Sequence, residues 1–173
     1  MTDLSGPPGR SSPPAWSEAV DIIDVLPGDH RFEAVVALAA SVLEQDRYVV
    51  RQHPHATESH VLAAFDGDEC LGFLRFLVQV IGTEESRPPV VHHGVPLTEA
   101  YVEAFGVDPR ARRRGIGSSL QDRAINDARA ARCHQMRSRS PVTSVANYAL
   151  KIAAGYVLSP SEQNDSYYFL RKL

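Results

Sequence analysis

Residues 107–120 read VDPRARRRGIGSSL. It places four arginines, within residues 110–114, directly before Gly115 and Gly117, and two serines follow. Where a strand, a glycine loop and a helix follow one another, the first N–H groups of the helix have no partner and carry the positive end of its dipole. Glycines let such a backbone approach a phosphate and adopt a positive φ. The stretch therefore predicts an anion-binding site at the start of a helix.

Positive charge is concentrated around this loop. Residues 110–139 hold nine of the 18 Lys and Arg residues and two acids, Asp122 and Asp127. A solvated basic helix face is the alternative interpretation. The net charge of the whole chain is -3, which gives no reason to expect bulk binding to nucleic acid. The charge pattern indicates a local anion site.

The bulk composition describes one ordinary soluble domain. The chain has 173 residues, of which 43% are hydrophobic and 23% charged. It lacks an apolar run of about 18 residues, so we expect no membrane span. Residues 1–16 are rich in Pro, Ser and Gly and predict a flexible tail before a single domain over 17–173. The two cysteines, Cys70 and Cys133, have no zinc spacing, so we expect a reduced, cytoplasmic protein without a metal.

Periodicity and turn residues predict a mixed α/β (α+β) domain with a largely antiparallel sheet flanked by helices. Residues 46–59 are ambiguous, and residues 82–98, with three prolines, are expected to form a loop. The expected strands and helices, in chain order, are strand 20–25, helix 32–43, a hairpin of 60–65 and 71–81, strand 100–107, helix 117–131, strand 136–140, helix 144–154, and strands 156–158 and 167–173.

Three known phosphate-binding loops have a glycine-rich turn before a helix, as this stretch does. The ATP/GTP loop needs a lysine after its last glycine, and none follows Gly117. The dinucleotide loop needs a third glycine, which is missing. The stretch resembles the coenzyme A loop of the GCN5-related N-acetyltransferase (GNAT) family, V-x-P-x-x-R/Q-x-x-G-x-G/A. The resemblance covers about residues 20–173, and Gly155-Tyr156 stands where the family usually has Gly-Phe.

The resemblance implies acetyl-CoA as co-substrate and a GNAT-like fold. The N–H groups of residues 112–118 would hold the pyrophosphate, and the arginine side chains would add positive charge near the phosphates. The backbone of the preceding strand would hold the acetyl carbonyl, as an oxyanion hole does. The cofactor-binding positions so implied are Phe105, Val107, Arg112, Arg113, Arg114, Gly115, Ile116, Gly117, Ser118 and Asn147.

A general base is needed because the acceptor amine must lose a proton before it attacks the thioester. Glu103 is the first candidate, since it lies two residues from Phe105 and shares its face if no bulge intervenes. A solvated or paired strand glutamate is the alternative interpretation. Further candidates are Glu99 and the loop histidines His53, His55, His92 and His93.

The second helix departs from the family pattern N-x-x-A-x-x-L-Y-x-x-x-G-F. Counting back from Gly155, Lys151 falls on the position of the tyrosine acid, and Ser144 on that of the asparagine. Tyr148, a neighbour of Lys151 on the helix, is the candidate acid, or else a packing tyrosine. The thiolate leaves unassisted, another residue protonates it, or the protein binds CoA without efficient transfer.

We expect an acetyl-CoA-dependent N-acetyltransferase whose acceptor is a small-molecule amine, with neither nucleic acid nor membrane as partner. The alternative is a non-catalytic acyl-CoA-binding or regulatory domain on the same fold. An RNA-contacting module ranks last because no aromatic residues interleave with the arginines. Acids in residues 46–59, 82–98 and 159–166 favour a cationic acceptor. O-acetylation, a longer acyl group and a homodimer stay open.

Overall fold

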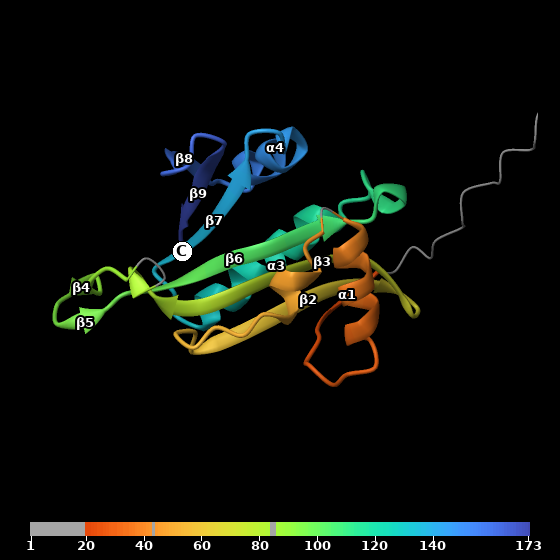
Figure 1. Ribbon diagram of the computed structural model, residues 1–173, viewed down its shortest axis with the longest axis horizontal. Helices are drawn as coiled ribbons and strands as arrows, with labels where there is room; N and C mark the ends of the chain where they lie inside the picture. The colour runs from red at the N-terminus through yellow and green to blue at the C-terminus, as the bar shows by residue number, and fades with distance from the viewer. Residues whose placement is uncertain (1–19, 43, 84–85) are drawn as a thin grey trace, which may run out of the picture.

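The computed structural model describes residues 20–42, 44–83 and 86–173 (Figure 1), so the expected tail over 1–16 lies outside the described residues. A seven-stranded sheet forms the centre of the molecule. Its neighbouring strands are antiparallel except for β6 and β7, which confirms the mixed, mostly antiparallel prediction. In sheet order the strands are β1 (Asp21–Asp24), β2 (Glu58–Asp66), β3 (Glu69–Val80), β6 (Thr98–Val107), β7 (Gln135–Pro141), β9 (Ser166–Lys172) and β8 (Val157–Pro160).

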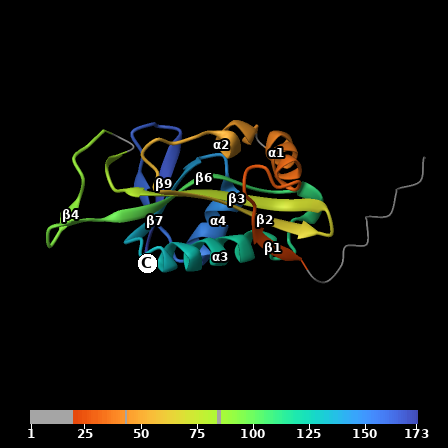
Figure 2. The same ribbon diagram turned by 90° about the horizontal axis from the view of Figure 1, so that it is seen from below.

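Helices cover both faces of this sheet (Figure 2). On one side, here named the α1 face, lie α1 (Phe32–Ser41) and α2 (Asp46–Val50). On the other side, the α3 face, lie α3 (Ile116–Ala130) and α4 (Val145–Ala153). In the described part of the chain, no helix has both the length and the apolar character needed to cross a membrane.

Covering both faces explains why the central strands are almost continuously apolar. In β2, Leu62 and Ala64 belong to the core beneath α3, whereas Ala63 and Phe65 belong to the core beneath α1. Alternate residues of a strand point to opposite faces, so both sets must be apolar. The hairpin that joins β2 to β3 turns at Gly67, whose φ is +59°, as its Asp-Gly turn predicts.

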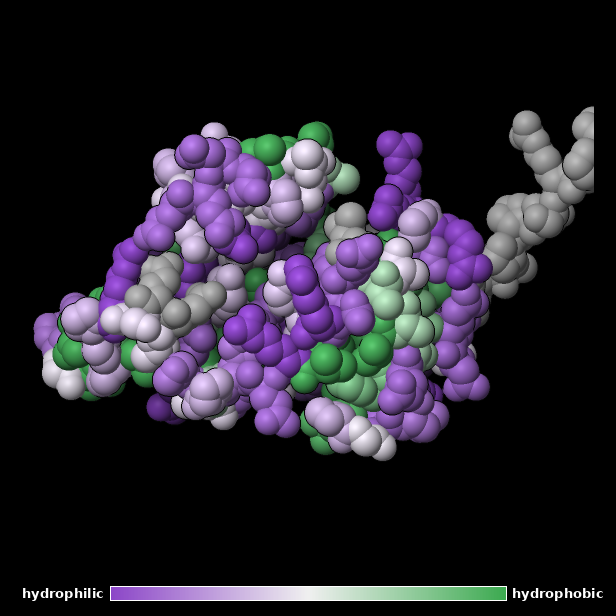
Figure 3. All heavy atoms as spheres, in the orientation of Figure 1, coloured by the Kyte–Doolittle hydropathy of each residue, from purple (hydrophilic) through white to green (hydrophobic). Residues whose placement is uncertain are grey.

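Two segments contain structure that periodicity did not predict. The ambiguous stretch 46–59 contains the short helix α2. The expected loop 82–98 contains a small hairpin of β4 (Val91–His92) and β5 (Val95–Pro96), which projects from one end of the sheet (Figure 1). Positive φ values at the two residues of its turn, 50° at His93 and 78° at Gly94, make the reversal. Figure 3 shows apolar surface at this end, where Val91 is 55% and Val95 63% exposed.

The pairing between β6 and β7 is short. It joins Glu99–Val102 to Gln135–Ser138, and beyond it β6 continues to Val107 while β7 pairs with β9. The two halves of the sheet spread apart from this point (Figure 1). The divergence leaves one edge of β6 without a strand beside it, directly before the arginine and glycine loop.

A bulge marks the same point of β6. Opposite β3, Phe76 pairs with Val102 and Arg75 with Ala104, so Glu103 is an extra residue without a partner in the register. A bulge turns the residues that follow it to the other face. The start of the bulge and the end of the pairing with β7 coincide.

Candidate functional site

The loop after β6 begins with a tight turn that Asp108 stabilises. Its carboxylate accepts a hydrogen bond from the backbone N–H of Arg110 (2.8 Å) at the start of the turn Pro109–Ala111. The guanidinium of Arg110 lies 2.6 Å from Asp108 and 2.9 Å from Glu69. These bonds to Arg110 hold the pKa of Asp108 below its usual value. Arg110 therefore belongs to the turn rather than to the cations available for a ligand.

The loop then enters α3 through two residues with positive φ. Arg113 has a φ of 62° and Gly115 a φ of 79°, and no side chain caps the start of α3. Gly117 follows in the first turn of the helix. A Cβ at Gly117 would lie 3.3 Å from Cζ of Phe105 and 3.5 Å from Cδ2 of Leu150. The helix start therefore lies against both β6 and α4, and its first N–H groups have no capping side chain.

Ile116 anchors this helix start in the core. It is 5% exposed and packs with Leu120 among the residues beneath α3. Gly72 of β3 lets it approach, since a Cβ there would lie 3.0 Å from Cγ2 of Ile116. Ser118, one residue past Gly117, is exposed. Of the implied cofactor residues, Ile116 thus has an evident packing role.

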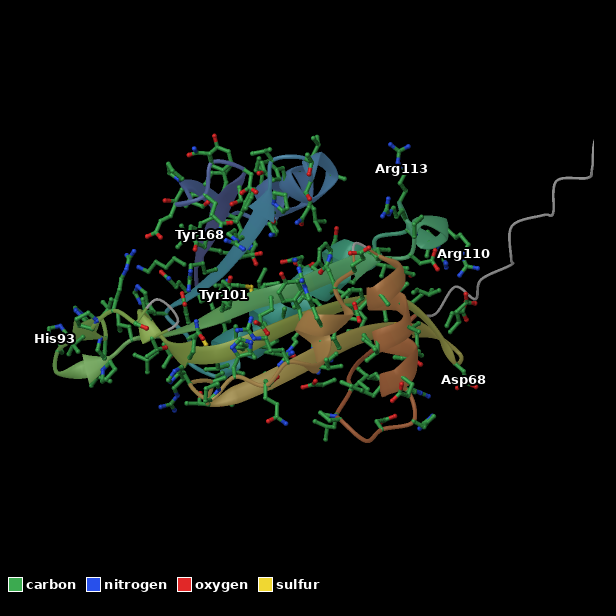
Figure 4. The ribbon with its side chains drawn as sticks, viewed as in Figure 1. Asp68, His93, Tyr101, Arg110, Arg113 and Tyr168 are labelled. Carbon is green, nitrogen blue, oxygen red and sulfur yellow. The ribbon has the colours of Figure 1, made fainter. Side chains whose placement is uncertain are left out.

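The remaining arginines of the loop face solvent. Arg112, Arg113 and Arg114 are exposed, and Nε of Arg112 donates to the backbone oxygen of Val107 (3.3 Å). Figure 4 shows Arg113 projecting from the loop on the side nearer to α4, whereas Arg110 lies on its other side. The positive charge therefore surrounds the start of α3.

The open edge of β6 is occupied by a side chain. The backbone N–H of Phe105 donates to Oε1 of Gln45 (2.9 Å), and Nε2 of Gln45 donates to the backbone oxygen of Phe105 (3.3 Å). The carboxamide thus takes the place of a neighbouring strand beyond Val102, where β7 has left. Sequence reasoning missed Gln45, because its contact depends on how the segment after α1 crosses the sheet.

On the other side of the divergence, α4 meets β7 through a buried polar cluster. Lys151 is 1% exposed, and its Nζ donates to Oγ of Ser138 (2.6 Å) and of Ser140 (2.7 Å). Burial lowers the pKa of Lys151 to about 7. Asn147 donates from Nδ2 to Oγ of Ser140 (3.0 Å), while its Oδ1 is buried and has no hydrogen-bond partner among the described residues.

Tyr148, the expected acid, is partly buried beside this cluster. Its hydroxyl donates to the backbone oxygen of Ser140 (3.2 Å), and its ring lies edge-on to Phe169 at 4.8 Å. Burial, with a smaller contribution from Tyr167, raises the pKa of Tyr148. Both the ring packing and the bond to the strand favour a packing role for this tyrosine. Lys151 is the ionisable residue that lies deeper.

Glu103, the expected base, lies on the α1 face and pairs with His53. Its Oε1 is 2.6 Å from Nε2 of His53, and its Oε2 is 3.6 Å from Nε of Arg75. The Glu103 side chain is 5% exposed and that of His53 17%. Because of the bulge, Glu103 does not share a face with Phe105, which packs against the core beneath α3. The structure thus brings together two residues that the sequence offered as separate candidates.

Arg75 holds this cluster to α2. It is 4% exposed and donates to the backbone oxygens of Tyr48 and Arg51, and to Oγ of Ser59 at 3.3 Å. A cation at the carboxyl end of a helix complements the helix dipole. Sequence reasoning missed Arg75, since a lone arginine in a strand is ordinarily taken as exposed.

Glu99, the second candidate base, is committed to structure. It is 0% exposed and accepts hydrogen bonds from Arg137 (2.7 Å), Gln135 (2.9 Å) and Gln79 (3.2 Å). Burial alone would raise the pKa of Glu99, but the bonds from Arg137 outweigh it and hold the pKa below its usual value. The guanidinium of Arg137 also lies 4.5 Å from the ring of Tyr101 and 5.1 Å from that of Tyr168, whose positions Figure 4 shows.

The other candidate histidines lie apart from the loop. His92 and His93 contact each other, with ring centroids 4.0 Å apart, at the tip of the small hairpin. Figure 4 shows His93 at the end of the molecule far from Arg113. His55 is exposed. None of these three joins the group around Glu103.

Comparisons with known proteins agree on one fold. The family model of the acetyltransferase (GNAT) family matches residues 29–149. Among solved structures, Arabidopsis thaliana NAA60 in complex with acetyl-CoA aligns with a TM-score of 0.71 and 15% identity, covering 90% of this chain and 99% of that one. Ard1 from Thermoplasma volcanium aligns with a TM-score of 0.66 and 20% identity, covering 90% and 98%.

A third neighbour has the same fold. The IAA acetyltransferase from Bacillus cereus aligns with a TM-score of 0.63 and 16% identity, covering 90% of this chain and 100% of that one. No curated protein matches the chain in sequence. At these identities the structural neighbours establish the fold alone.

Proposed function

Because the chain belongs to the GNAT acetyltransferase family, we propose that it transfers an acetyl group from acetyl-CoA to the amine of a small molecule. Acetyl-CoA is the co-substrate of this family. The observation that carries the proposal is the uncapped start of α3, surrounded by exposed arginines, where β6 and β7 have diverged. A helix start of this kind favours a phosphorylated ligand.

The residues around this helix start fit coenzyme A. A Cβ at Gly117 would crowd Cζ of Phe105 at 3.3 Å, so this position favours a residue without a side chain. Arg112, Arg113 and Arg114 supply positive charge for phosphates. The buried Oδ1 of Asn147 lacks a hydrogen-bond donor among the described residues, which an amide of the pantetheine arm would provide. When bound, acetyl-CoA supplies the activated acetyl group.

The backbone N–H of Phe105 is the group proposed to hold the acetyl oxygen. It lies on the open edge of β6 and now donates to Gln45. An N–H fixed in a strand is already oriented before charge develops on that oxygen, which is the basis of oxyanion stabilisation. Gln45 must leave this N–H for the role to be filled.

His53 and Glu103 form the proposed base. An amine attacks only after losing its proton, and an imidazole held by a carboxylate can serve as the general base. His53 is the more exposed member of the pair, 17% against 5%, so the proton enters through His53 while Glu103 orients its ring. The position of the pair supports this assignment. Glu103 is the first β6 residue beyond the pairing with β7, and the bulge lies at this residue.

A cavity on the α1 face supports a small acceptor. A surface cavity of about 450 Å³ is lined by His53, Arg75, Ser59 and Arg51. Its volume lies in the range of small-ligand sites, about 300–1,000 Å³.

Calorimetric titration of acetyl-CoA and CoA into the purified protein tests the proposal. We expect micromolar binding that Gly117→Glu abolishes, because the glutamate puts bulk and negative charge at the pyrophosphate site. Asn126→Glu, an exposed position farther along α3, is the charge-matched control and should bind normally. Absence of binding to the wild type would remove the proposal.

A panel of amines then separates catalysis from binding. Release of CoA thiol with at least one small amine is the expected result. Cofactor binding without turnover on any amine would favour the alternative, a non-catalytic acyl-CoA-binding domain. Turnover on a peptide N-terminus and on no small amine would correct the acceptor class.

A further inference from the structure

Lys151 is a buried amine whose polar partners are neutral. Its Nζ bonds to the hydroxyls of Ser138 and Ser140 and lies 4.9 Å from the ring centroid of Phe169. Within the described ranges, no carboxylate lies at ion-pair distance from it, and burial is the cause that lowers its pKa. A buried charge without a counter-ion is costly, and an apolar side chain of similar size would avoid that cost.

Its place in the fold connects it to the proposed site. Ser138 is the last residue of β7 that pairs with β6, and Ser140 lies just beyond, so Lys151 stands at the point of divergence. Leu150, its neighbour in α4, lies 3.5 Å from the Cβ position of Gly117. Lys151 therefore lies on the α3 face between β7 and the elements that meet the helix start.

The pair of His53 and Glu103 lies at the same point of β6, on the opposite face. The pairing of β6 with β7 ends at Val102, one residue before Glu103. A group that accepts a proton thus lies on the α1 face, and one that can release a proton lies on the α3 face. Such an arrangement suits an acyl transfer in which one group takes a proton from the amine and another gives one to the leaving group.

We propose that Lys151 protonates the sulfur that leaves when the acetyl group is transferred, an inference that rests on the proposed function. When the C–S bond breaks, its electron pair stays on sulfur, and Lys151 passes one proton from Nζ to that sulfur. His53 and Glu103 release the proton of the acceptor amine to solvent, from which Lys151 is recharged. Protons therefore balance over each cycle.

Another ionisable group shares a hydrogen-bond partner with Lys151. Tyr148, on the same helix, also bonds to Ser140, and its ring lies 6.4 Å from that of Tyr167 on β9. Burial raises the pKa of Tyr148, which makes this phenol a poorer proton donor at neutral pH. An amine whose pKa lies near 7 is matched to the task, since proton donors work best near the working pH.

The ionisation of free CoA bound to the protein tests this role without any acceptor. The ultraviolet absorbance of the thiolate reports the pKa of the bound thiol, which for an ordinary thiol is about 8.5. We expect the bound thiol of the wild type to ionise with a pKa at least about one unit, or tenfold in its constant, below that in Lys151→Met. Equal values in the two proteins would overturn the proposal.

Tyr148→Phe tests the competing assignment. Loss of the phenol should leave the pKa of the bound thiol unchanged, because the phenol is held by the backbone of β7. A shift in Tyr148→Phe with none in Lys151→Met would give the role to the tyrosine.

A second measurement uses the wild type alone, in case Lys151→Met does not fold. Desulfo-CoA lacks the thiol, so the ratio of its affinity to that of CoA reports contacts with sulfur. We expect the preference for CoA over desulfo-CoA to be largest between the pKa of Lys151, about 7, and that of an ordinary thiol, about 8.5, where a charged amine and a thiolate coexist, and smaller in acid and in alkali. A ratio that does not change with pH rejects the role of Lys151, and binding of neither compound rejects the proposed function.

Discussion

The two ends of the β6–β7 pairing hold buried charge in opposite ways. At the closed end, where the strands pair, Glu99 is 0% exposed and forms an ion pair with Arg137 at 2.7 Å. At the open end, Lys151 is 1% exposed, and its hydrogen-bond partners are the hydroxyls of Ser138 and Ser140. The first charge is fully compensated, whereas the second is solvated by neutral groups.

We interpret the charge of the Glu99–Arg137 pair as structural and that of Lys151 as the functional one proposed above. A compensated pair keeps both protonation states fixed, which suits a junction that must not change. An uncompensated amine titrates near neutral pH and can give up its proton. Substitutions at the two ends should therefore have effects of opposite sign on stability.

The largest effect is expected at the closed end. Glu99→Ala leaves Arg137 buried without its carboxylate and should lower the free energy of unfolding by about 3–5 kcal/mol. Urea denaturation measures it. The double variant Glu99→Ala/Arg137→Met, which removes both charges, should recover part of the loss, and a single variant as stable as the wild type would contradict the interpretation.

At the open end, the contribution of Lys151 to stability should depend on pH. The pKa of Lys151 in the folded protein, about 7, lies below its ordinary value of 10.5, so the unfolded chain binds more protons between these pH values. Stability of the wild type relative to Lys151→Met should therefore rise with pH across this window, by up to about 1.4 kcal/mol per pH unit.

Urea midpoints of the wild type and Lys151→Met, compared from neutral to alkaline pH, give this difference. Subtraction removes the titration of groups that the two proteins share, such as Tyr156 and Cys70. At neutral pH the variant should be at least as stable as the wild type. Parallel curves would show that Lys151 does not change its proton affinity on folding.

A smaller effect concerns the open edge of β6. Gln45→Ala removes the carboxamide that now occupies the N–H and the oxygen of Phe105. If a ligand competes for these groups, the affinity for CoA should rise by about fivefold, which corresponds to about 1 kcal/mol. Calorimetry measures it, with Gln52→Ala, an exposed glutamine after α2, as the control. A weaker affinity would mean that Gln45 supports the ligand.

The smallest effect is expected for a compensated pair that is partly exposed. Nδ1 of His60 lies 2.6 Å from Asp24. The hydrogen bond that His60 donates to Asp24 raises the pKa of His60 above 6.5. Burial opposes ionisation of Asp24, but the bonds from His60 and Val61 lower its pKa below 3.8. Asp24→Asn should cost less than about 1 kcal/mol because solvent screens the pair.

The pH dependence of this cost has a defined sign. The contribution of His60 is complete below pH 6.5 and is lost as the pH rises through its raised pKa. That of Asp24 is present above pH 3.8 and is lost as the pH falls through its lowered pKa. The difference in unfolding free energy between the wild type and Asp24→Asn should therefore peak between these values, and a cost that grows at alkaline pH would refute the pairing.

The order of the elements followed from local patterns. Apolar periodicity marked α1 and α3, the Asp-Gly turn marked the β2–β3 hairpin, and Gly155, with a φ of 81°, ends α4 as expected. These features depend on neighbours within a few residues. The loop before α3 was also recognisable, because its glycines and arginines are contiguous in the chain.

The missed features depend on contacts between distant residues. The bulge at Glu103 arises from the register with β3, and the pairing of Glu103 with His53 from the path after α2. Burial of Lys151 requires two hydroxyls on β7. The small hairpin was not predicted, because its strands have two residues each and its segment is rich in proline. The bulge, the pair and the buried lysine each depend on residues that are distant in the sequence, so local patterns do not predict them.

The parallel pairing of β6 with β7 also has a consequence for the order of folding. The strands of each half, β1-β2-β3-β6 and β7-β9-β8, are antiparallel neighbours, but the halves join through residues 99–102 and 135–138, separated by α3. A parallel pairing needs a crossover connection and is slightly less stable per residue than an antiparallel one. We therefore expect each half to assemble first and this junction to close last. The surface between Phe105 and Asn147 would then form in the final folding step. A ligand that binds both residues would therefore stabilise the junction between the two halves of the sheet.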